Sequence, residues 1–149
     1  KITGYLWIDL DKRLEMEWGI TILQYFAQYG EDAFREEESL LLKRLLDTPT
    51  PSIFSTGGVS VLREENRAMM NGYGRTVCLT ADIEKIIQRL GNSYSRPLLK
   101  GNIEEAVHSL YKKRQGMYTF ADIIIDTSTT SCNAIADEII SFWDIDKLC

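Results

Sequence analysis

Residues 52–67 read Ser-Ile-Phe-Ser-Thr-Gly-Gly-Val-Ser-Val-Leu-Arg-Glu-Glu-Asn-Arg. A short β-prone run ends in Gly57-Gly58, and a charged, helix-prone run follows from Arg63. Two consecutive glycines at the end of a strand require unusual backbone dihedrals, or allow another group to approach the backbone closely. Open α/β sheets bind their ligands at the carboxyl ends of strands. The stretch is therefore either a ligand-binding loop or a loop that simply needs positive φ.

The composition is that of one ordinary globular domain. The chain has 149 residues, of which 44% are hydrophobic and 26% charged, so it can bury a core. The net charge of −5 argues against a nucleic acid or an anionic membrane as the main partner, while a few local arginines can still hold a small anion. No apolar run approaches the length of a membrane span. The three cysteines have no metal-binding spacing and indicate reduced thiols in a cytosol-like compartment.

The first residues predict a chain that begins partway through a domain. There is no Met at position 1, and Lys1-Ile2-Thr3-Gly4 looks like the end of a helix with a glycine just past it. An apolar run, Tyr5 to Ile8, follows at once and predicts a buried strand.

Two carboxylates, Asp9 and Asp11, follow this strand. Carboxylates at a strand end suit a hydrated magnesium ion or the proton of a hydroxyl group. The alternative is that Asp11 only caps the helix that follows, predicted over residues 12–18.

A lone cation precedes three glutamates in the next helical region. Thr21 and Gln24 form a capping-box pair that opens one helix, Gly30 ends it, and an acidic run opens the next. Arg35 either pairs with Glu38 one turn away, or offers its guanidinium fork to a carboxylate while Glu38 steadies it from behind.

The remaining chain continues the alternation of strands and helices. It contains a polar loop at 91–102, bounded by glycines, that is either a mobile cover or an inert surface loop. The lone His108 is expected at the surface or the edge of the core rather than as a catalyst. Alternating strands and helices predict a parallel sheet with helices on both faces, a three-layer α/β/α fold in a single domain, 1–149. The later strands are expected at 76–80 and 122–126, and the later helices at 63–71, 82–90, 103–115 and 133–143.

With these elements placed, the chain resembles the shikimate kinase family of the P-loop kinase group from about Gly4 to about Ile140. Five segments in matching order carry the resemblance: Asp9-x-Asp11; Phe34-Arg35-x-x-Glu38; Thr56-Gly57-Gly58 with Leu62 and Glu64-Glu65-Asn66-Arg67; Arg89 with Arg96-Pro97-Leu98-Leu99; and Arg114 with Tyr118 and Ala121-Asp122.

The resemblance implies a P-loop-kinase-like fold that transfers the γ-phosphate of ATP to shikimate, with Mg²⁺, in the route to chorismate and the aromatic amino acids. Phosphoryl transfer needs the two substrates to be held in position and positive charge to be distributed around the transferring phosphoryl group. The resemblance implies that Asp11 accepts the proton of the 3-hydroxyl and that Asp9 holds magnesium through water. It implies that Arg35 and Arg114 bind the shikimate carboxylate, while Gly57 and Gly58 let the backbone approach the ring hydroxyls. On the nucleotide side, Arg96 would swing in with the lid and Arg89 would lie on adenine.

Two of the chain's departures from the family concern the phosphate-binding loop and the triple glycine. It contains no G-x-x-x-x-G-K-[ST], the phosphate-binding loop that in the family follows a central strand and precedes the equivalent of Gly4. Without that strand we expect unpaired backbone and low stability, and activity should require the missing loop. Val59 replaces the third glycine of the family's triple glycine and adds bulk near the substrate.

Two alternatives remain open besides an active shikimate kinase. The chain could be a non-catalytic, kinase-like module that binds shikimate or regulates, or a related small-molecule kinase of different specificity. In each case we expect a monomer in the cytoplasm, or in a plastid if the source is a plant, with a small-molecule substrate and a nucleotide as partners.

Overall fold

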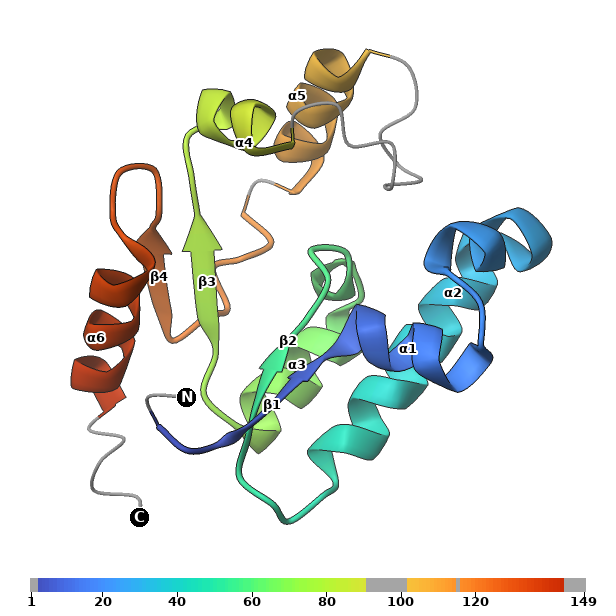
Figure 1. Cartoon of the computed structure of the whole chain (residues 1–149), viewed down its shortest axis with the longest axis horizontal. Helices are drawn as coiled ribbons and strands as arrows, with labels where there is room; N and C mark the ends of the chain where they lie inside the picture. The colour runs from blue at the N-terminus through green and yellow to red at the C-terminus, as the bar shows by residue number, and fades with distance from the viewer. Residues whose placement is uncertain (1–2, 91–101, 115, 144–149) are drawn as a thin grey trace.

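The computed structural model describes residues 3–90, 102–114 and 116–143. Strands and helices alternate along these residues, as predicted (Figure 1). In chain order the elements are β1 (Leu6–Asp9), α1 (Leu10–Trp18), α2 (Ile22–Leu46), β2 (Ser52–Ser55), the short 3-10 helix η1 (Ser60–Leu62), α3 (Glu64–Tyr73), β3 (Val77–Thr80), α4 (Ile83–Leu90), α5 (Ile103–Arg114), β4 (Ile123–Asp126) and α6 (Cys132–Trp143).

The strands form two parallel pairs. β1 pairs with β2, with Asp9 opposite Ser55, and β3 pairs with β4, with Thr80 opposite Asp126. The arrows of all four strands point towards the same end of the molecule (Figure 1). The predicted parallel arrangement is confirmed, but β2 and β3 are not joined by a ladder in the part of the chain that the structure describes. Among the described residues, each of these two strands therefore has a partner along one edge only.

The prediction that the first strand is buried is wrong for its outer half. Leu6 is 55% exposed and Trp7 is 57% exposed. Burial of a strand depends on what covers it, and no described element covers these two side chains. The ammonium group of Lys12, 5.7 Å from the ring centroid of Trp7, is the cation–π neighbour on this exposed surface.

Helix α2 is bent at Gly30, where the sequence predicted a break. The capping box of Thr21 and Gln24 opens the helix, with Gln24 N donating to Thr21 Oγ1 at 3.2 Å and Thr21 N donating to Gln24 Oε1 at 2.8 Å. Gly30 has φ 83° and ψ 176°, a conformation that residues with a Cβ rarely adopt. The bend lets the two halves of α2 point in different directions, and the second half carries Arg35 and Glu38.

The main core lies among α1, α2 and α3. Its members are buried apolar side chains on the facing sides of these helices, and each contributes about 1.5–3 kcal/mol relative to an exposed position. Because Leu41 and Leu42 anchor the second half of α2, the polar side chains on its other face are held in fixed positions. The buried set is Leu10, Leu14, Phe34, Leu41, Leu42 and Met70.

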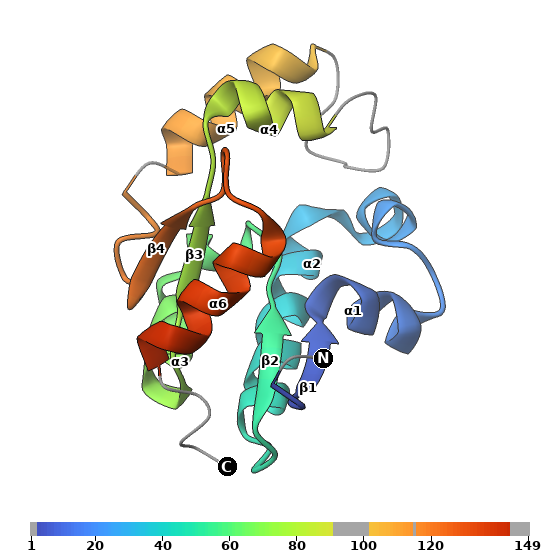
Figure 2. The same ribbon diagram turned by 60° about the vertical axis from the view of Figure 1, so that its left-hand side comes forward.

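The remaining helices surround β3 and β4. Figure 2 shows α6 in front of the strands and α3 behind them, while α4 and α5 lie at the end towards which the strands point. Cys78 on β3 and Ile125 on β4 are buried. His108 on α5 is exposed, as predicted. Among the described helices, none has the length and hydropathy needed to cross a membrane.

Candidate active site

The two aspartates at the end of β1 have different positions. Asp9 is the N-cap of α1, and its Oδ1 accepts a hydrogen bond from Lys12 N at 3.1 Å. The capping role that the sequence suggested for Asp11 therefore belongs to Asp9, because the helix begins at Leu10, two residues earlier than predicted. Asp11 lies in the first turn of α1 and faces the double-glycine loop: a methyl group on Gly57 would sit 3.1 Å from Asp11 Oδ1 and 3.7 Å from Oδ2.

Arg35 and Glu38 form a buried ion pair on the second half of α2. Arg35 Nη1 lies 3.1 Å from Glu38 Oε2, and Arg35 Nη2 lies 3.1 Å from Glu31 Oε1. Arg35 is 7% exposed and Glu38 is 1% exposed. The pairing with Glu38 that the sequence offered as the simpler alternative is present, and it fixes the guanidinium rather than leaving it in solvent.

Glu38 links α2 to the double-glycine loop. Its Oε1 accepts a hydrogen bond from Ser60 Oγ at 2.6 Å, and a methyl group on Gly57 would lie 3.3 Å from the same oxygen. Burial raises the pKa of Glu38 above its ordinary value, and the nearby Asp11 charge raises it further. The hydrogen bond from Ser60 and the charge of Arg35 act in the opposite direction. Glu38 thus connects helix α2 to the double-glycine loop and fixes the position of the Arg35 guanidinium group.

Gly58 brings a second guanidinium to the same loop. A methyl group on Gly58 would lie 3.2 Å from Arg114 Nη1 and 3.7 Å from the Tyr118 hydroxyl oxygen. Tyr118 donates a hydrogen bond to the carbonyl oxygen of Gly58 at 3.2 Å. Arg114 is the last residue of α5, as the sequence predicted, and its buried Nε has no hydrogen-bond partner in the described structure. A buried donor of this kind is a candidate for contact with an anionic ligand.

The double glycine is therefore the meeting point of the predicted substrate residues. Asp11 lies against Gly57, Arg114 lies against Gly58, and Arg35 is joined to the loop through Glu38. The absence of a side chain at both glycines leaves room for these groups to converge. Guanidinium groups that approach one place can bind a carboxylate, and a carboxylate beside them can accept a proton from a hydroxyl group.

Arg89 lies elsewhere. It is in the last turn of α4, and its Nη1 donates to Thr127 Oγ1 at 2.9 Å while its Nη2 donates to the Thr127 carbonyl oxygen at 2.5 Å. These bonds hold α4 to the turn after β4. The pKa of Asp126 is lowered mainly by hydrogen bonds from Ser128, and the positive charge of Arg89 lowers it further. No contact places Arg89 at the double glycine. Arg96 and residues 91–101 of the predicted lid lie outside the described residues.

Val59, which replaces the third glycine, has an ordinary backbone conformation. Val59 has φ −107° and ψ −18°, which a β-branched residue adopts without needing positive φ, and it is the residue before η1. The third glycine position thus keeps an ordinary backbone in this chain. Its side chain is half-buried.

Sequence reasoning missed the polar residues that brace the loop. Asn66 Nδ2 donates to the Ser60 carbonyl oxygen at 3.0 Å, and both residues are buried. Arg67 Nη1 donates to the Val61 carbonyl oxygen at 2.6 Å. The sequence does place polar residues on both sides of the apolar pair Val61 and Leu62. Because a buried backbone needs hydrogen-bond partners, this pattern could have indicated that those polar side chains bond to the loop.

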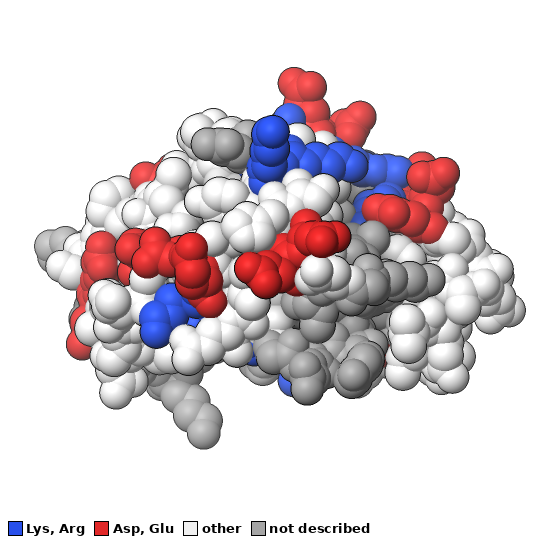
Figure 3. All heavy atoms as spheres, turned by 90° about the horizontal axis from the view of Figure 1, so that it is seen from above, with Lys and Arg blue, Asp and Glu red and all other residues white. Residues whose placement is uncertain are grey.

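Charge on the end of the molecule at which α4 and α5 lie is mixed. Figure 3, viewed from above, shows lysine and arginine side chains beside clusters of aspartate and glutamate. The described surface there carries no continuous field of one sign. Among the described residues, no three His, Cys, Asp or Glu side chains come together as a metal site.

Comparison with known proteins shows the family to which the chain belongs. The family described as "Shikimate kinase" matches residues 1–144. The chain belongs to the shikimate kinase family. The shikimate kinase of Pelotomaculum thermopropionicum is 38% identical over 136 residues, which is 91% of this chain and 78% of that relative. The shikimate kinase of Geobacter sulfurreducens is 38% identical over 140 residues, or 93% of this chain and 77% of the relative.

A solved shikimate kinase has the same fold. The structure of the Acinetobacter baumannii enzyme in complex with shikimate superposes with a TM-score of 0.90 and 29% identity, covering 98% of this chain and 82% of that chain. The predicted α/β fold of the shikimate kinase and P-loop kinase type is thereby confirmed, as is the family assigned from five short segments. Transferase, kinase and ATP-binding are the properties that go with this family membership.

Proposed function

We propose that this chain supplies the substrate-binding and proton-accepting part of a shikimate kinase, which transfers the γ-phosphate of ATP to the 3-hydroxyl of shikimate. The single observation that supports this most strongly is the convergence of Asp11 and Arg114 on the two adjacent glycines, with Arg35 held beside them by Glu38. Shikimate offers one carboxylate and neighbouring hydroxyl groups, so it needs guanidinium groups at one end and a proton acceptor at the other.

The contacts support the following proposed roles. Arg35 and Arg114 bind the shikimate carboxylate through their N–H groups. Asp11 accepts the proton of the 3-hydroxyl and orients its oxygen for attack on the γ-phosphorus of ATP, whose bond to the bridging oxygen of ADP breaks. Gly57 and Gly58 let the backbone approach the ring. Glu38 positions Arg35 and the loop, without itself touching substrate.

The nucleotide side of the reaction is carried by other residues. Asp9 would hold a hydrated magnesium ion, because its hydrogen bond to Lys12 N fixes the carboxylate, and hydrated magnesium needs only one or two protein carboxylates. The ion would neutralise charge on the transferring phosphate. Arg96, within a lid at 91–102, would meet the phosphoryl group, and Arg89 would lie against adenine at the end of α4.

A phosphate-binding loop must complete this site, since the chain contains no Gly-Lys pair. The test is a coupled ADP-release assay on the chain as given and on a fusion that places a strand and a Gly-x-x-x-x-Gly-Lys-Ser loop before Lys1. We expect shikimate-dependent ADP release from the fusion and none from the chain alone. A folded fusion without turnover, while its loop binds ATP, would refute the assignment of Asp11.

A binding module without catalysis is a second candidate, favoured by the same missing loop. It predicts that shikimate raises the Tm of the chain as given while ATP with magnesium does not. If ATP with magnesium raises the Tm clearly, this candidate fails. A substrate panel including gluconate on the fusion separates shikimate kinase from a related kinase of other specificity. We further propose a monomer in the cytoplasm, in keeping with the unpaired thiols of Cys78 and Cys132.

A further inference from the structure

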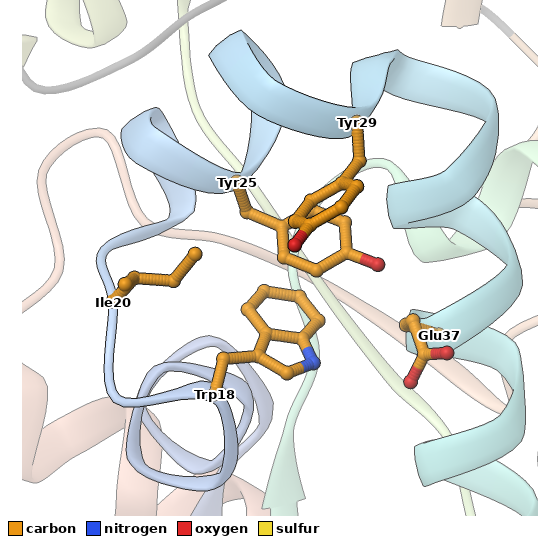
Figure 4. A pocket seen from close by; sticks show the side chains of 5 residues that line it. All are labelled: Trp18, Ile20, Tyr25, Tyr29 and Glu37. Atoms are coloured by element: carbon orange, nitrogen blue, oxygen red, sulfur yellow. The ribbon is translucent and has the colours of Figure 1, made fainter.

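A pocket lies away from the double-glycine loop, between the end of α1 and α2. Its volume is about 310 Å³, at the small end of the range for sites of small organic ligands. Figure 4 shows the five side chains that line it: Trp18, Ile20, Tyr25, Tyr29 and Glu37. None of them contacts Asp11, Gly57, Gly58 or Arg114 in the interactions described above.

Three aromatic rings form one wall of the pocket. Trp18 and Tyr25 are stacked with ring centroids 3.9 Å apart and an interplanar angle of 22°, and Tyr25 and Tyr29 lie 4.7 Å apart at 44°. Trp18 also meets the core residue Phe34 edge-on at 6.0 Å. The wall is therefore tied to the core. Aromatic faces carry partial negative charge and attract cations within about 6 Å of the ring centroid.

Glu37 adds a carboxylate that has no counter-charge of its own. Its neighbours Glu36 and Glu38 lie 3.7 Å and 3.1 Å from an arginine. Glu37 makes no ion pair or hydrogen bond with any other residue that the structure describes. Burial raises the pKa of the Tyr25 hydroxyl, and the charge of Glu37 raises it further, so the negative charge is felt inside the pocket.

Two polar groups of the pocket face Glu37, while the hydroxyl of Tyr29 points away from it. Figure 4 shows the indole nitrogen of Trp18 and the hydroxyl of Tyr25 turned towards Glu37, with Ile20 at the opposite end. A ligand that fits both ends has a positive group beside Glu37 and an apolar body against Ile20 and the indole ring.

We propose that this pocket binds a small organic cation, an ammonium group carried on an aryl or alkyl body. An anion would face the uncompensated carboxylate of Glu37. A neutral ligand would take water away from that carboxylate without replacing the interaction. The ammonium group satisfies both Glu37 and the aromatic faces, and the site is distinct from the one proposed for shikimate.

The test compares phenethylammonium with 2-phenylethanol, which has a similar shape and no charge. The chain is labelled with 5-fluorotryptophan, and the ¹⁹F resonance of Trp18 is assigned by its loss in Trp18→Phe. We expect a saturable shift of that resonance with phenethylammonium, and a Kd for 2-phenylethanol at least about five-fold weaker, in line with the strength of a partly desolvated cation–π contact. The resonances of the other tryptophans serve as internal references.

Two variants separate the charge of Glu37 from the general acidity of α2. Glu37→Gln is expected to weaken phenethylammonium binding about five-fold or more, while Glu36→Gln, with the same change of charge one residue away, leaves it unchanged. Excess shikimate should not displace the amine. The proposal is overturned if the Trp18 resonance does not move, if the alcohol binds as tightly as the amine, if both variants behave alike, or if shikimate competes.

Discussion

Asp11 and Gly57 lie so close that a methyl group on Gly57 would sit 3.1 Å from the Asp11 carboxylate oxygen Oδ1. That separation is tighter than most Cβ contacts, so Gly57→Ala must push Asp11 aside by a few tenths of an ångström. Misplacement of a reacting group is costly, and we expect kcat of the loop-bearing fusion to fall about 10- to 100-fold. Steady-state kinetics with saturating shikimate measures this.

The matched control is Gly72→Ala. Gly72 lies inside α3, and a methyl group there would meet no atom within 4 Å. Alanine in a helix interior is more stable than glycine by about 0.5–1 kcal/mol, so this variant should raise the midpoint of urea unfolding and keep kcat. Equal loss of kcat in both variants would mean that the Asp11 contact has no part in turnover.

Arg35→Lys tests the guanidinium fork. Lysine keeps the charge beside Glu38, but it cannot present two parallel N–H groups to a carboxylate. We expect KM for shikimate to rise about 10- to 100-fold, the effect of losing about 1.5–3 kcal/mol of charged hydrogen bonding, with KM for ATP unchanged. The measurement is the full two-substrate kinetic matrix of the fusion.

Arg44→Lys is the control for this substitution. Arg44 pairs with Glu17 at 2.7 Å, but its side chain is 60% exposed. Exposed pairs contribute little, so both KM values and the stability should stay close to those of the parent. A rise of KM for shikimate in Arg44→Lys equal to that in Arg35→Lys would remove the case for a specific fork.

Glu38 gives the fold a defined response to pH. Burial raises the pKa of Glu38 in the folded protein above its ordinary value of 4.5, so the folded state binds the proton more tightly than the unfolded state does. The stability that protonation provides is complete below pH 4.5 and is lost as pH rises through the folded pKa. In urea unfolding measured from pH 4 to pH 8, the free energy of unfolding of the parent protein should fall with rising pH relative to that of Glu38→Gln. A difference that is flat or rises with pH contradicts the burial of Glu38.

The strand edges make a prediction for amide hydrogen exchange. β2 is bonded only to β1, and β3 only to β4, within the described chain. Amides alternate in direction along a strand, so every second amide of β2 and β3 should exchange quickly while its neighbours in the ladder exchange slowly. Exchange measured by NMR at low protein concentration distinguishes the two sets. Uniform protection in both strands would show that these edges are already paired.

Local patterns in the sequence predicted most elements, because they depend on neighbouring residues. The capping box at Thr21, the bend at Gly30 and the end of α5 at Arg114 were all located in this way. Burial of the first strand was predicted wrongly, since the exposure of Leu6 and Trp7 depends on which distant elements cover them.

The candidate site was predictable to the level of residue types and no further. The chemistry of Asp11 and Arg114 suggested their roles, but their contacts with the two glycines join segments far apart in the sequence. The bonds of Ser60 to Glu38 and of Tyr118 to Gly58 have no signature in local spacing. The aromatic pocket was likewise missed, because it forms only when α2 folds back over the end of α1.

Within the described part of the chain, β2 and β3 each have one bonded edge, and this also affects how copies of the chain behave together. An edge with unbonded N–H and C=O groups can pair with the edge of another molecule. If β2 of one copy adds to β3 of the next, the contact is head-to-tail and has no geometric reason to close into a ring, so it can extend into filaments. Protein concentration, more than temperature, would then set the shelf life of a preparation, and a short strand peptide that pairs with these edges would keep it dispersed.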